Sequence, residues 1–257
     1  MNAVVEDHPS GLPIRGPQRR VIESLGRAIV GGVYPPGSIL PKEDHFIAEY
    51  GVSRTPFREA AKVLAAKGLI EIRQKVGTRV RPENLWNALD SDLLRWYAEE
   101  GRREEVIRDL LEVREMLEPA AARLAASRAT PEDRAEIAAA YRRMSESVGD
   151  PEEYAASDVA FHLAVFAATH NVLLQRFGNF VADFLRLSFD IQQAALLERD
   201  HVRDFSPDLD AHRFVLESLD RSAPAAAAEA MLEAILAGRR DLLYSLEAQS
   251  GDTNSNK

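Results

Sequence analysis

The sequence predicts a mainly α-helical protein in two parts, an N-terminal module with a small β-hairpin and a C-terminal all-helical bundle. The charge is divided unevenly, because residues 15–81 carry 13 Lys and Arg against 6 Asp and Glu, whereas the rest carries 19 against 35. The hydrophobic pattern also changes near Pro82, from short elements separated by glycine turns to long stretches with apolar residues three and four positions apart. We therefore expect a basic domain over residues 15–82 and an acidic domain over residues 83–250.

Composition limits the class of protein. The 257 residues suffice for two ordinary domains, and the absence of cysteine excludes disulfides, thiolate metal ligands and a cysteine nucleophile. No apolar run approaches the roughly 18 residues that a membrane-spanning helix needs, and the N-terminus lacks the order of a signal peptide. We expect a soluble cytoplasmic protein with no membrane partner and with disordered ends at residues 1–14 and 251–257.

The basic module divides into three helices and a hairpin. Helices are predicted over about residues 19–30, just after Pro41, and from residues 53–55 to the next glycine. Two short β-prone runs follow at residues 69–73 and 78–81. Three helices followed by a basic hairpin is the order of a winged helix-turn-helix, in which the third helix enters the major groove of DNA.

The third predicted helix has two distinct faces. Ser53 or Thr55 can cap this helix, and its apolar face contains Phe57, Ala61 and Leu64. Three basic residues spaced four apart form the other face: Arg54, Arg58 and Lys62. Arginine at the N-terminal end of such a helix can form two hydrogen bonds with guanine, although the spacing alone fits an ordinary solvated basic face equally well.

A resemblance to the DNA-binding domain of GntR-family regulators is carried by residues 32–37, 51–60, 64–70 and 77–80. The resemblance covers the whole module. It implies DNA contacts from the third helix and from a hairpin wing that reaches the minor groove: Ser53, Arg54, Thr55, Arg58, Lys62, Gly77 and Thr78.

Three positions depart from the pattern of this family. Asp44 stands where the family usually has arginine, which puts one backbone contact of the second helix in doubt and points to a different operator preference. Phe57 and Ala61 stand where the family usually has valine and leucine.

In the acidic part, Arg114 lies on an otherwise apolar helical stripe that includes Leu110, Leu117 and Ala121. A buried guanidinium group needs an anionic partner. One interpretation is a structural ion pair with Glu118 or a residue of a neighbouring helix. The other is a contact of two hydrogen bonds with the carboxylate of a small effector.

A second group of polar residues is predicted inside the bundle. Asp158 and His162 lie one turn apart on a helix that is apolar nearly all round, and His212 lies on the apolar side of a later helix. A lone histidine on an apolar face is more often a satisfied core residue than a ligand. A carboxylate with two imidazoles is nevertheless a normal ligand set for zinc, nickel or manganese.

Residues from about 85 to 249 resemble the effector domain of the FadR subfamily, the FCD-type helical bundle, through residues 112–126, residues 158–171 and His212. Metal-binding members are similar at Asp158, His162 and His212 but have a third histidine where this chain has Ala234. The resemblance therefore implies a divalent metal held by fewer ligands, or a site without metal. It also implies that Asn171 lies near the effector, although a helix cap explains this asparagine equally well.

These patterns together predict a ligand-responsive DNA-binding regulator and no enzyme. We expect a repressor of a catabolic operon that binds a palindromic double-stranded DNA operator as a homodimer and responds to a small carboxylate effector such as a sugar acid. Residues 85–96 are similar to those of regulators that respond to sugar acids such as galactonate, although Trp86 and Trp96 could instead hold the two domains together. Two alternatives are a metal-dependent hydrolase built on the Asp158, His162 and His212 group, and a DNA-binding dimer that responds to no ligand.

Overall fold

The computed structural model describes residues 16–73, 77–198 and 205–252. The chain divides into two compact units, Met1–Arg103 and Glu104–Lys257. This division falls about twenty residues after the boundary expected at residue 82, because a further short helix packs within the first unit. The N-terminal segment expected to be disordered lies outside the described residues.

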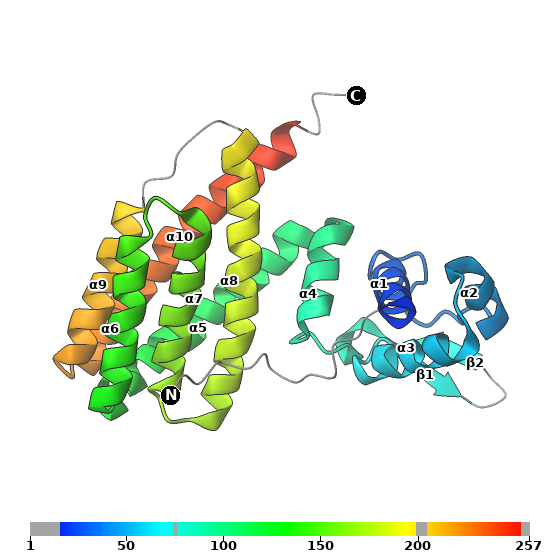
Figure 1. Cartoon of the computed structure of the whole chain (residues 1–257), viewed down its shortest axis with the longest axis horizontal. Helices are drawn as coiled ribbons and strands as arrows, with labels where there is room; N and C mark the ends of the chain where they lie inside the picture. Colours follow the sequence, from blue (N-terminus) through cyan, green and yellow to red (C-terminus); the bar gives the residue numbers. More distant parts are fainter. Residues whose placement is uncertain (1–15, 74–76, 199–204, 253–257) are drawn as a thin grey trace. The chain divides into compact units, whose positions relative to one another are not determined.

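The described part of the first unit begins with three helices and an antiparallel hairpin, in the order that the sequence predicts (Figure 1). In the hairpin, Ile70 pairs with Val80 and Arg73 pairs with Gly77. The elements are α1 (Pro17–Val30), α2 (Glu43–Tyr50), α3 (Arg54–Ala66), β1 (Ile70–Arg73) and β2 (Gly77–Val80).

Glycine 51 turns the chain between the second and third helices. Gly51 adopts a left-handed conformation with φ of 61°, and its amide donates to the carbonyl of Ile47 at the end of α2. Apolar side chains from α1, α2, α3 and β1 fill the space between these elements, and they include Leu25, Ile29, Phe46 and Leu64. This core fixes the orientation of α3, the helix with the cationic face.

The short helix α4 (Ser91–Tyr97) follows a single 3₁₀ turn, η1 (Glu83–Leu85), and packs against α1. The Nε1 atom of Trp96 donates to Glu23 of α1 at 2.9 Å, and the indole ring lies against Gly26, where a side chain would overlap it. Trp86 donates to the carbonyl of Arg81 at 2.9 Å. Both tryptophans thus stabilise the first unit from within, and the hypothesis that they hold two domains together does not describe their contacts.

The end of α3 is tied to α4 by a group of charged residues. Lys67 is 13% exposed, and its Nζ atom binds Asp90 at 2.7 Å and Asp92 at 2.8 Å. The carbonyl of Lys67 accepts from the amide of Asn87 at 2.9 Å. After α4, the π-helical turn η2 (Ala98–Arg102) contains Gly101 with φ of 90°.

The second unit is an all-helical bundle, as the sequence predicts (Figure 1). Its helices are α5 (Arg103–Arg128), α6 (Pro131–Glu146), α7 (Pro151–Ala167), α8 (Val172–Glu198), α9 (Ser206–Asp220) and α10 (Pro224–Asp252). The last helix includes two residues of the C-terminal segment expected to be disordered, because a helix end assigned from sequence is uncertain by one or two residues. None of the helices in the described ranges is long and apolar enough to cross a membrane.

Proline directly follows Thr130, Asp150 and Ser206, an order that predicts a helix capped by each of these residues, and the structure has such caps at the first two. Thr130 and Asp133 form a reciprocal capping box at α6, and the side chain of Asp150 accepts from the amide of Glu153 at α7. The expectation that Ser206 caps α9 is wrong, because the cap position is Phe205 and Ser206 already belongs to the helix. Pro207 is still accommodated, since an amide in the first turn has no partner within the helix.

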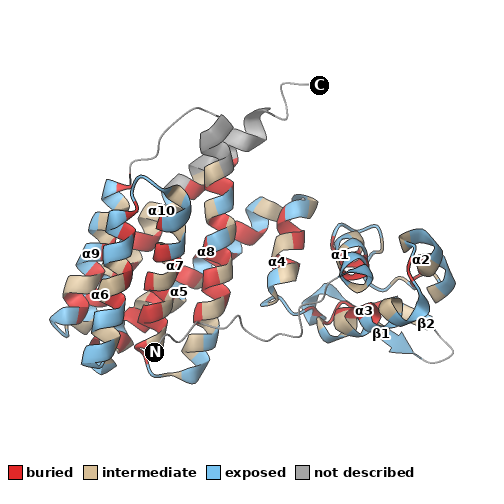
Figure 2. Cartoon of the chain, viewed as in Figure 1, coloured by how far each residue is buried: buried red, intermediate tan, exposed pale blue. Residues whose placement is uncertain are grey.

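The bundle core lies between α5, α6, α7, α9 and α10, where the inward faces are buried (red in Figure 2). Helix α7 lies at its centre and buries side chains on several sides, including Phe161, Val165 and Phe166. A polar side chain on this helix must therefore find its partners inside the protein. Asp158 and His162 are in this position.

Candidate functional site

The cationic face of α3 is exposed, and each of its basic side chains has an acidic partner. Arg54 donates to Asp44 at 2.8 Å, and Arg58 donates to both carboxylate oxygens of Glu43 at 3.1 Å. Lys62 binds Glu59 on the same helix at 2.8 Å. The three cations therefore lie on one accessible surface but are partly neutralised in the free protein.

The other predicted DNA contacts lie at the start of α3 and in the hairpin. Ser53 occupies the cap position but its side chain makes no capping hydrogen bond, and both Ser53 and Thr55 are exposed. Gly77 is exposed with φ of 109°, and Thr78 is partly buried. The rest of the predicted wing tip, residues 74–76, lies outside the described residues.

The apolar face of α3 carries the two other departures from the family pattern. Phe57 stacks on Phe46 of α2 with ring centroids 5.5 Å apart. Ala61 lines a hollow of about 300 Å³ between α2, α3 and the hairpin, together with Phe46 and Ile70. The small side chain of Ala61 leaves space where a larger one could pack.

In the second unit, Arg114 of α5 is buried and paired with Glu118 one turn later. Glu118 is 1% exposed and its second carboxylate oxygen lies against Nδ1 of His162 on α7. Burial raises the pKa of Glu118, but the positive charge of Arg114 and the contact with His162 outweigh it and lower that pKa to about 2. The structural ion pair is thus present, and it extends to a histidine.

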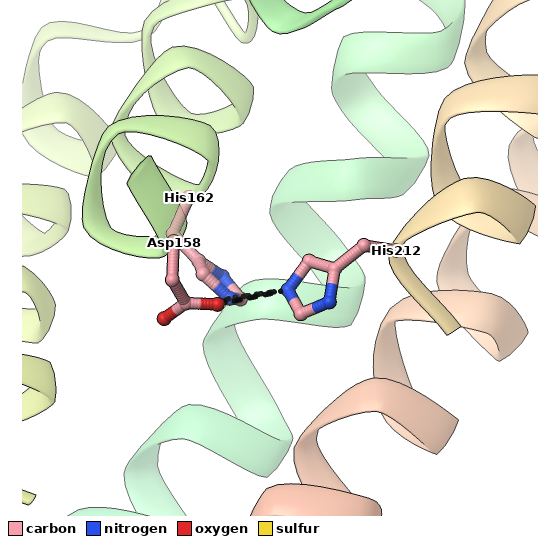
Figure 3. A group of neighbouring side chains, drawn as sticks. All are labelled: Asp158, His162 and His212. Atoms are coloured by element: carbon pink, nitrogen blue, oxygen red, sulfur yellow. Dashed lines mark hydrogen bonds and ion pairs between the residues drawn. The ribbon is translucent and has the colours of Figure 1, made fainter. Parts of the chain in front are cut away.

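Asp158, His162 and His212 converge in the centre of the bundle, as Figure 3 shows. The Nε2 atom of His212 lies 3.1 Å from Oδ1 of Asp158 and 3.3 Å from Nε2 of His162. The Nδ1 atom of His212 faces the backbone carbonyl of Asp208 at 2.7 Å. Two helices far apart in the sequence, α7 and α9, therefore bring together the three residues that the sequence singles out.

The partners of the two Nδ1 atoms determine what the two Nε2 atoms can do. Glu118 favours a proton on Nδ1 of His162, and the carbonyl of Asp208 favours a proton on Nδ1 of His212. In the neutral form, both Nε2 lone pairs then point toward one another across 3.3 Å. Such an arrangement favours a proton or a metal ion at these nitrogens, because Oδ1 of Asp158 lies 3.1 Å from Nε2 of His212 and provides a negative charge beside it.

The electrostatics of the site favour a bound proton when no metal is present. Burial lowers the pKa of His212, but the hydrogen bond to Asp158 and the charge of Asp208 outweigh it and raise that pKa to about 9. Burial likewise raises the pKa of Asp158, and the two imidazoles outweigh this effect and hold it well below its ordinary value. At neutral pH the site therefore contains an ionised carboxylate beside an imidazolium.

The same donor set fits a divalent metal. One ligand atom from each of Asp158, His162 and His212 lies within 4.8 Å of the others. Ligating histidines in metalloproteins commonly donate their other ring N–H to a carboxylate or a backbone carbonyl, and Glu118 and Asp208 provide these two acceptors. Zinc, nickel and manganese all accept such nitrogen and oxygen ligands.

A small pocket of about 50 Å³ lies beside this group. Ala234 of α10 lines it and is 4% exposed, so the position where metal-binding relatives are expected to have histidine does face the site. Ser188 also lines the pocket, and its buried hydroxyl has no hydrogen-bond partner among the described residues. The pocket therefore offers an unused polar group and a small side chain beside the two histidines.

Asn171, which the family resemblance places near the effector, lies at a helix start and not in the pocket lining. Its side chain accepts from the amides of Leu173 and Leu174 at the start of α8, which is the role of a helix cap. Asn171 is not among the residues that line the pocket.

Several pocket residues were not predicted from the sequence. Tyr154 donates to the carboxylate of Asp208 at 2.9 Å, and both residues line the pocket with Ser188 and Gln192. The spacing of four residues between Asp208 and His212 could have indicated that Asp208 lies on the same side of α9 as the histidine. Ser188 and Gln192 share a face of α8 by the same spacing, but nothing in the sequence marks that face as the one toward the histidines.

The sequence is similar to two known domain families and to characterised bacterial regulators. Residues 17–80 match the family described as bacterial regulatory proteins, gntR family, and residues 109–237 match the FCD domain. The chain is 35% identical over 226 residues to the galactonate operon transcriptional repressor of Escherichia coli K12, covering 87% of this chain and 95% of that protein. It is 34% identical over 200 residues to the Glc operon transcriptional activator of the same organism, covering 72% and 77%.

A solved structure supports the fold. The Lar protein of Listeria monocytogenes is 18% identical and aligns with a TM-score of 0.58 over 91% of this chain and 99% of its own. The two domain matches and the relative of 35% identity show that the chain belongs to the GntR family of bacterial regulators, in the FadR subfamily that carries an FCD domain. It is a DNA-binding transcription regulator and not an enzyme, which rules out the metal-dependent hydrolase considered from the sequence.

Proposed function

We propose that this regulator is a repressor of a catabolic operon and that a small carboxylate, such as a sugar acid, controls its binding to DNA. The main support is the pocket in the second unit, where Arg114, His162 and His212 provide positively charged or hydrogen-bonding groups beside a hollow. A relative 35% identical to the chain is a repressor of the galactonate operon, a name that fits a sugar acid. We also propose that this regulator works in the cytoplasm, because its DNA target lies there.

Arg114 is the residue proposed to bind the effector carboxylate. Only its Nε atom is directed to Glu118 in the ion pair described above, and the guanidinium group has further N–H donors for a second anion. Because Arg114 lines the pocket, these donors can meet a ligand there. The hydroxyl of Ser188 would donate to or accept from a hydroxyl group of the same ligand.

Asp158, His162 and His212 are the residues proposed to hold a divalent metal. When bound, the metal would offset the nearby carboxylates and provide a positive centre for oxygen atoms of the effector. Glu118 and Asp208 would keep the two imidazoles oriented with Nε2 toward the site. Ala234 leaves one ligand position without a protein side chain, which favours completion by water or by the effector itself.

The DNA-binding part of the proposal concerns the operator. A single winged helix contacts few base pairs, so we propose a homodimer that binds a palindromic site. Contacts would come from Arg54, Arg58 and Lys62 of α3, from the hydroxyls at its start, and from the hairpin at Gly77 and Thr78. We propose that the dimer has one arrangement that binds the operator and one that does not. An effector that binds these two arrangements with different affinity would shift operator occupancy.

A thermal-shift screen tests this proposal. The protein is treated with a chelator, dialysed, and incubated with galactonate, gluconate, glycolate or lactate, each with and without zinc. A compound that raises the melting temperature is then tested for release of the protein from DNA upstream of its own gene in a mobility-shift assay. If no carboxylate changes either the melting temperature or DNA binding, the alternative of a dimer that responds to no ligand is favoured.

A further inference from the structure

Two acidic side chains in the first turn of α2 hold the two arginines at the N-terminal end of α3. Oδ1 of Asp44 accepts from Nη2 of Arg54 at 2.8 Å, while Glu43 accepts from Nε of Arg58 at 3.1 Å. Glu43 also lies 4.0 Å from Nη1 of Arg54. Each arginine proposed to contact DNA is therefore restrained by a carboxylate from the preceding helix.

Stability alone does not account for this arrangement. The side chains of Arg54 and Asp44 are 63% and 75% exposed, and ion pairs at such exposure contribute little to folding. Acidic residues in the first turn do favour α2 through its dipole, which explains negative charge at these positions. The dipole does not explain why the carboxylates bind the arginines of a different helix.

We propose that Asp44 is a positioning residue that sets the sequence selectivity of α3 by orienting Arg54, with Glu43 restraining Arg58 in the same way. This inference rests on the proposed contact between these arginines and base edges. It assigns the selectivity of the helix to a residue outside the helix.

Restraint by Asp44 has two physical consequences. An arginine held in one orientation loses less side-chain entropy when it binds guanine, and its remaining N–H donors stay directed away from the carboxylate. A carboxylate near the DNA backbone also repels phosphate, and this cost is offset only where Arg54 finds a base partner. Non-cognate complexes are therefore weakened more than the cognate complex.

The test compares the selectivity of three full-length proteins. Wild-type protein is used to select its preferred site from a randomised duplex library, and the affinities of the wild type, Asp44→Asn and Glu49→Gln for this site and for a scrambled duplex are measured by fluorescence anisotropy. Glu49 is a matched control, because it is an exposed carboxylate on α2 that pairs with His45 rather than with an arginine. Asp44→Asn should lower the ratio of specific to non-specific affinity about tenfold, mainly through tighter non-specific binding, whereas Glu49→Gln should leave it unchanged.

The variant Arg54→Ala and the double variant Arg54→Ala with Asp44→Asn complete a double-mutant cycle with the wild type and Asp44→Asn. If Asp44 acts through Arg54, its substitution has no further effect on base preference once Arg54 is absent. Selectivity that survives Arg54→Ala would refute the base contact itself, which belongs to the proposed function. Selectivity lost in Arg54→Ala but retained in Asp44→Asn would overturn the positioning role alone, as would an equal loss in Glu49→Gln.

The melting temperature distinguishes a purely structural role of Asp44 from a role in DNA recognition. Because the pair is exposed and one first-turn carboxylate contributes little through the helix dipole, Asp44→Asn should lower the melting temperature by at most a few degrees. A change in base preference with so small a change in melting temperature supports the inference. A larger fall in melting temperature that accounts for the loss of selectivity would contradict it.

Discussion

His162 and His212 face each other through Nε2 atoms that lie 3.3 Å apart, and Asp158 is the carboxylate that they share. This relationship places two imidazole nitrogens and a carboxylate oxygen at one point in the bundle, a donor set that could hold a metal ion. The proposed metal would take the place of the proton that raises the charge of His212 in the metal-free protein.

Ala234→His should strengthen metal binding, because it adds a fourth protein ligand beside the three already present. We expect the dissociation constant for zinc to fall roughly 10- to 100-fold, the range that single changes around metal sites commonly produce. Isothermal titration calorimetry of the metal-free proteins with zinc measures this dissociation constant. Glu233→His is the control, since Glu233 is the exposed neighbour on the same helix, and equal tightening in both variants would contradict the placement of Ala234.

The metal-free protein should become less stable as the pH rises from about 7 through about 9. The folded pKa of His212 is raised to about 9 from an ordinary value of 6.5, so its contribution to stability is complete below 6.5 and is lost as pH rises through the folded pKa. Urea unfolding in a chelator buffer at several pH values measures this decline. His212→Gln should flatten it, and a decline that is unchanged in the variant would assign the effect to another group.

Arg114→Ala should destabilise the second unit by about 3–5 kcal/mol, because it leaves the buried carboxylate of Glu118 without its cationic partner. Chemical denaturation gives this value. The double variant Arg114→Met with Glu118→Gln removes both charges and should recover most of the stability. This folded double variant should bind DNA normally and fail to respond to a carboxylate effector; a normal response would exclude Arg114 from effector binding.

Arg58→Ala should cost about 1–3 kcal/mol of binding free energy on the preferred DNA site and much less on random DNA. The reason is that a base contact is lost only where the matching base is present. Lys62→Ala provides the comparison, since a lysine that binds phosphate should weaken both complexes equally. Anisotropy titrations at one salt concentration measure all four affinities, and equal losses in Arg58→Ala would remove this residue from base recognition.

Ala61→Leu should stabilise the first unit by about 1 kcal/mol, because the added side chain fills part of the hollow beneath α3. Thermal unfolding of the full-length protein measures the change. Ala66→Leu is a surface control on the same helix, since Ala66 is exposed. Destabilisation by Ala61→Leu would show that the hollow cannot accept a side chain of that size.

The sequence predicts much of this architecture because local rules determine it. The starts of α6 and α7 follow from Thr130 and Asp150, whose side chains bond to amides only three residues away. The hairpin and the left-handed turn at Gly51 follow from glycine positions in the same way. Long-range packing is less accessible: the start of α9 lies one residue from its predicted cap, and α4 joins the first unit through contacts with α1.

The candidate site could likewise be predicted only in part, because some of its contacts are local and others join distant helices. Burial of His162 and His212 follows from the apolar residues around them, so their convergence could be anticipated. The contact between Glu118 and His162 joins α5 to α7 across the packed bundle, and no spacing within one helix reports it. The carboxylates of α2 that bind Arg54 and Arg58 escaped prediction for a similar reason, because the turn between two helices sets their distance.

Lys67, Asp90 and Asn87 join the end of α3 to the segment that starts α4. The charged group of Lys67 binds Asp90, and its carbonyl accepts from the amide of Asn87, so a salt bridge and a backbone hydrogen bond connect the two helices. A substitution within residues 87–90 would therefore act on the C-terminal end of the helix proposed to contact DNA, although these residues lie outside that helix.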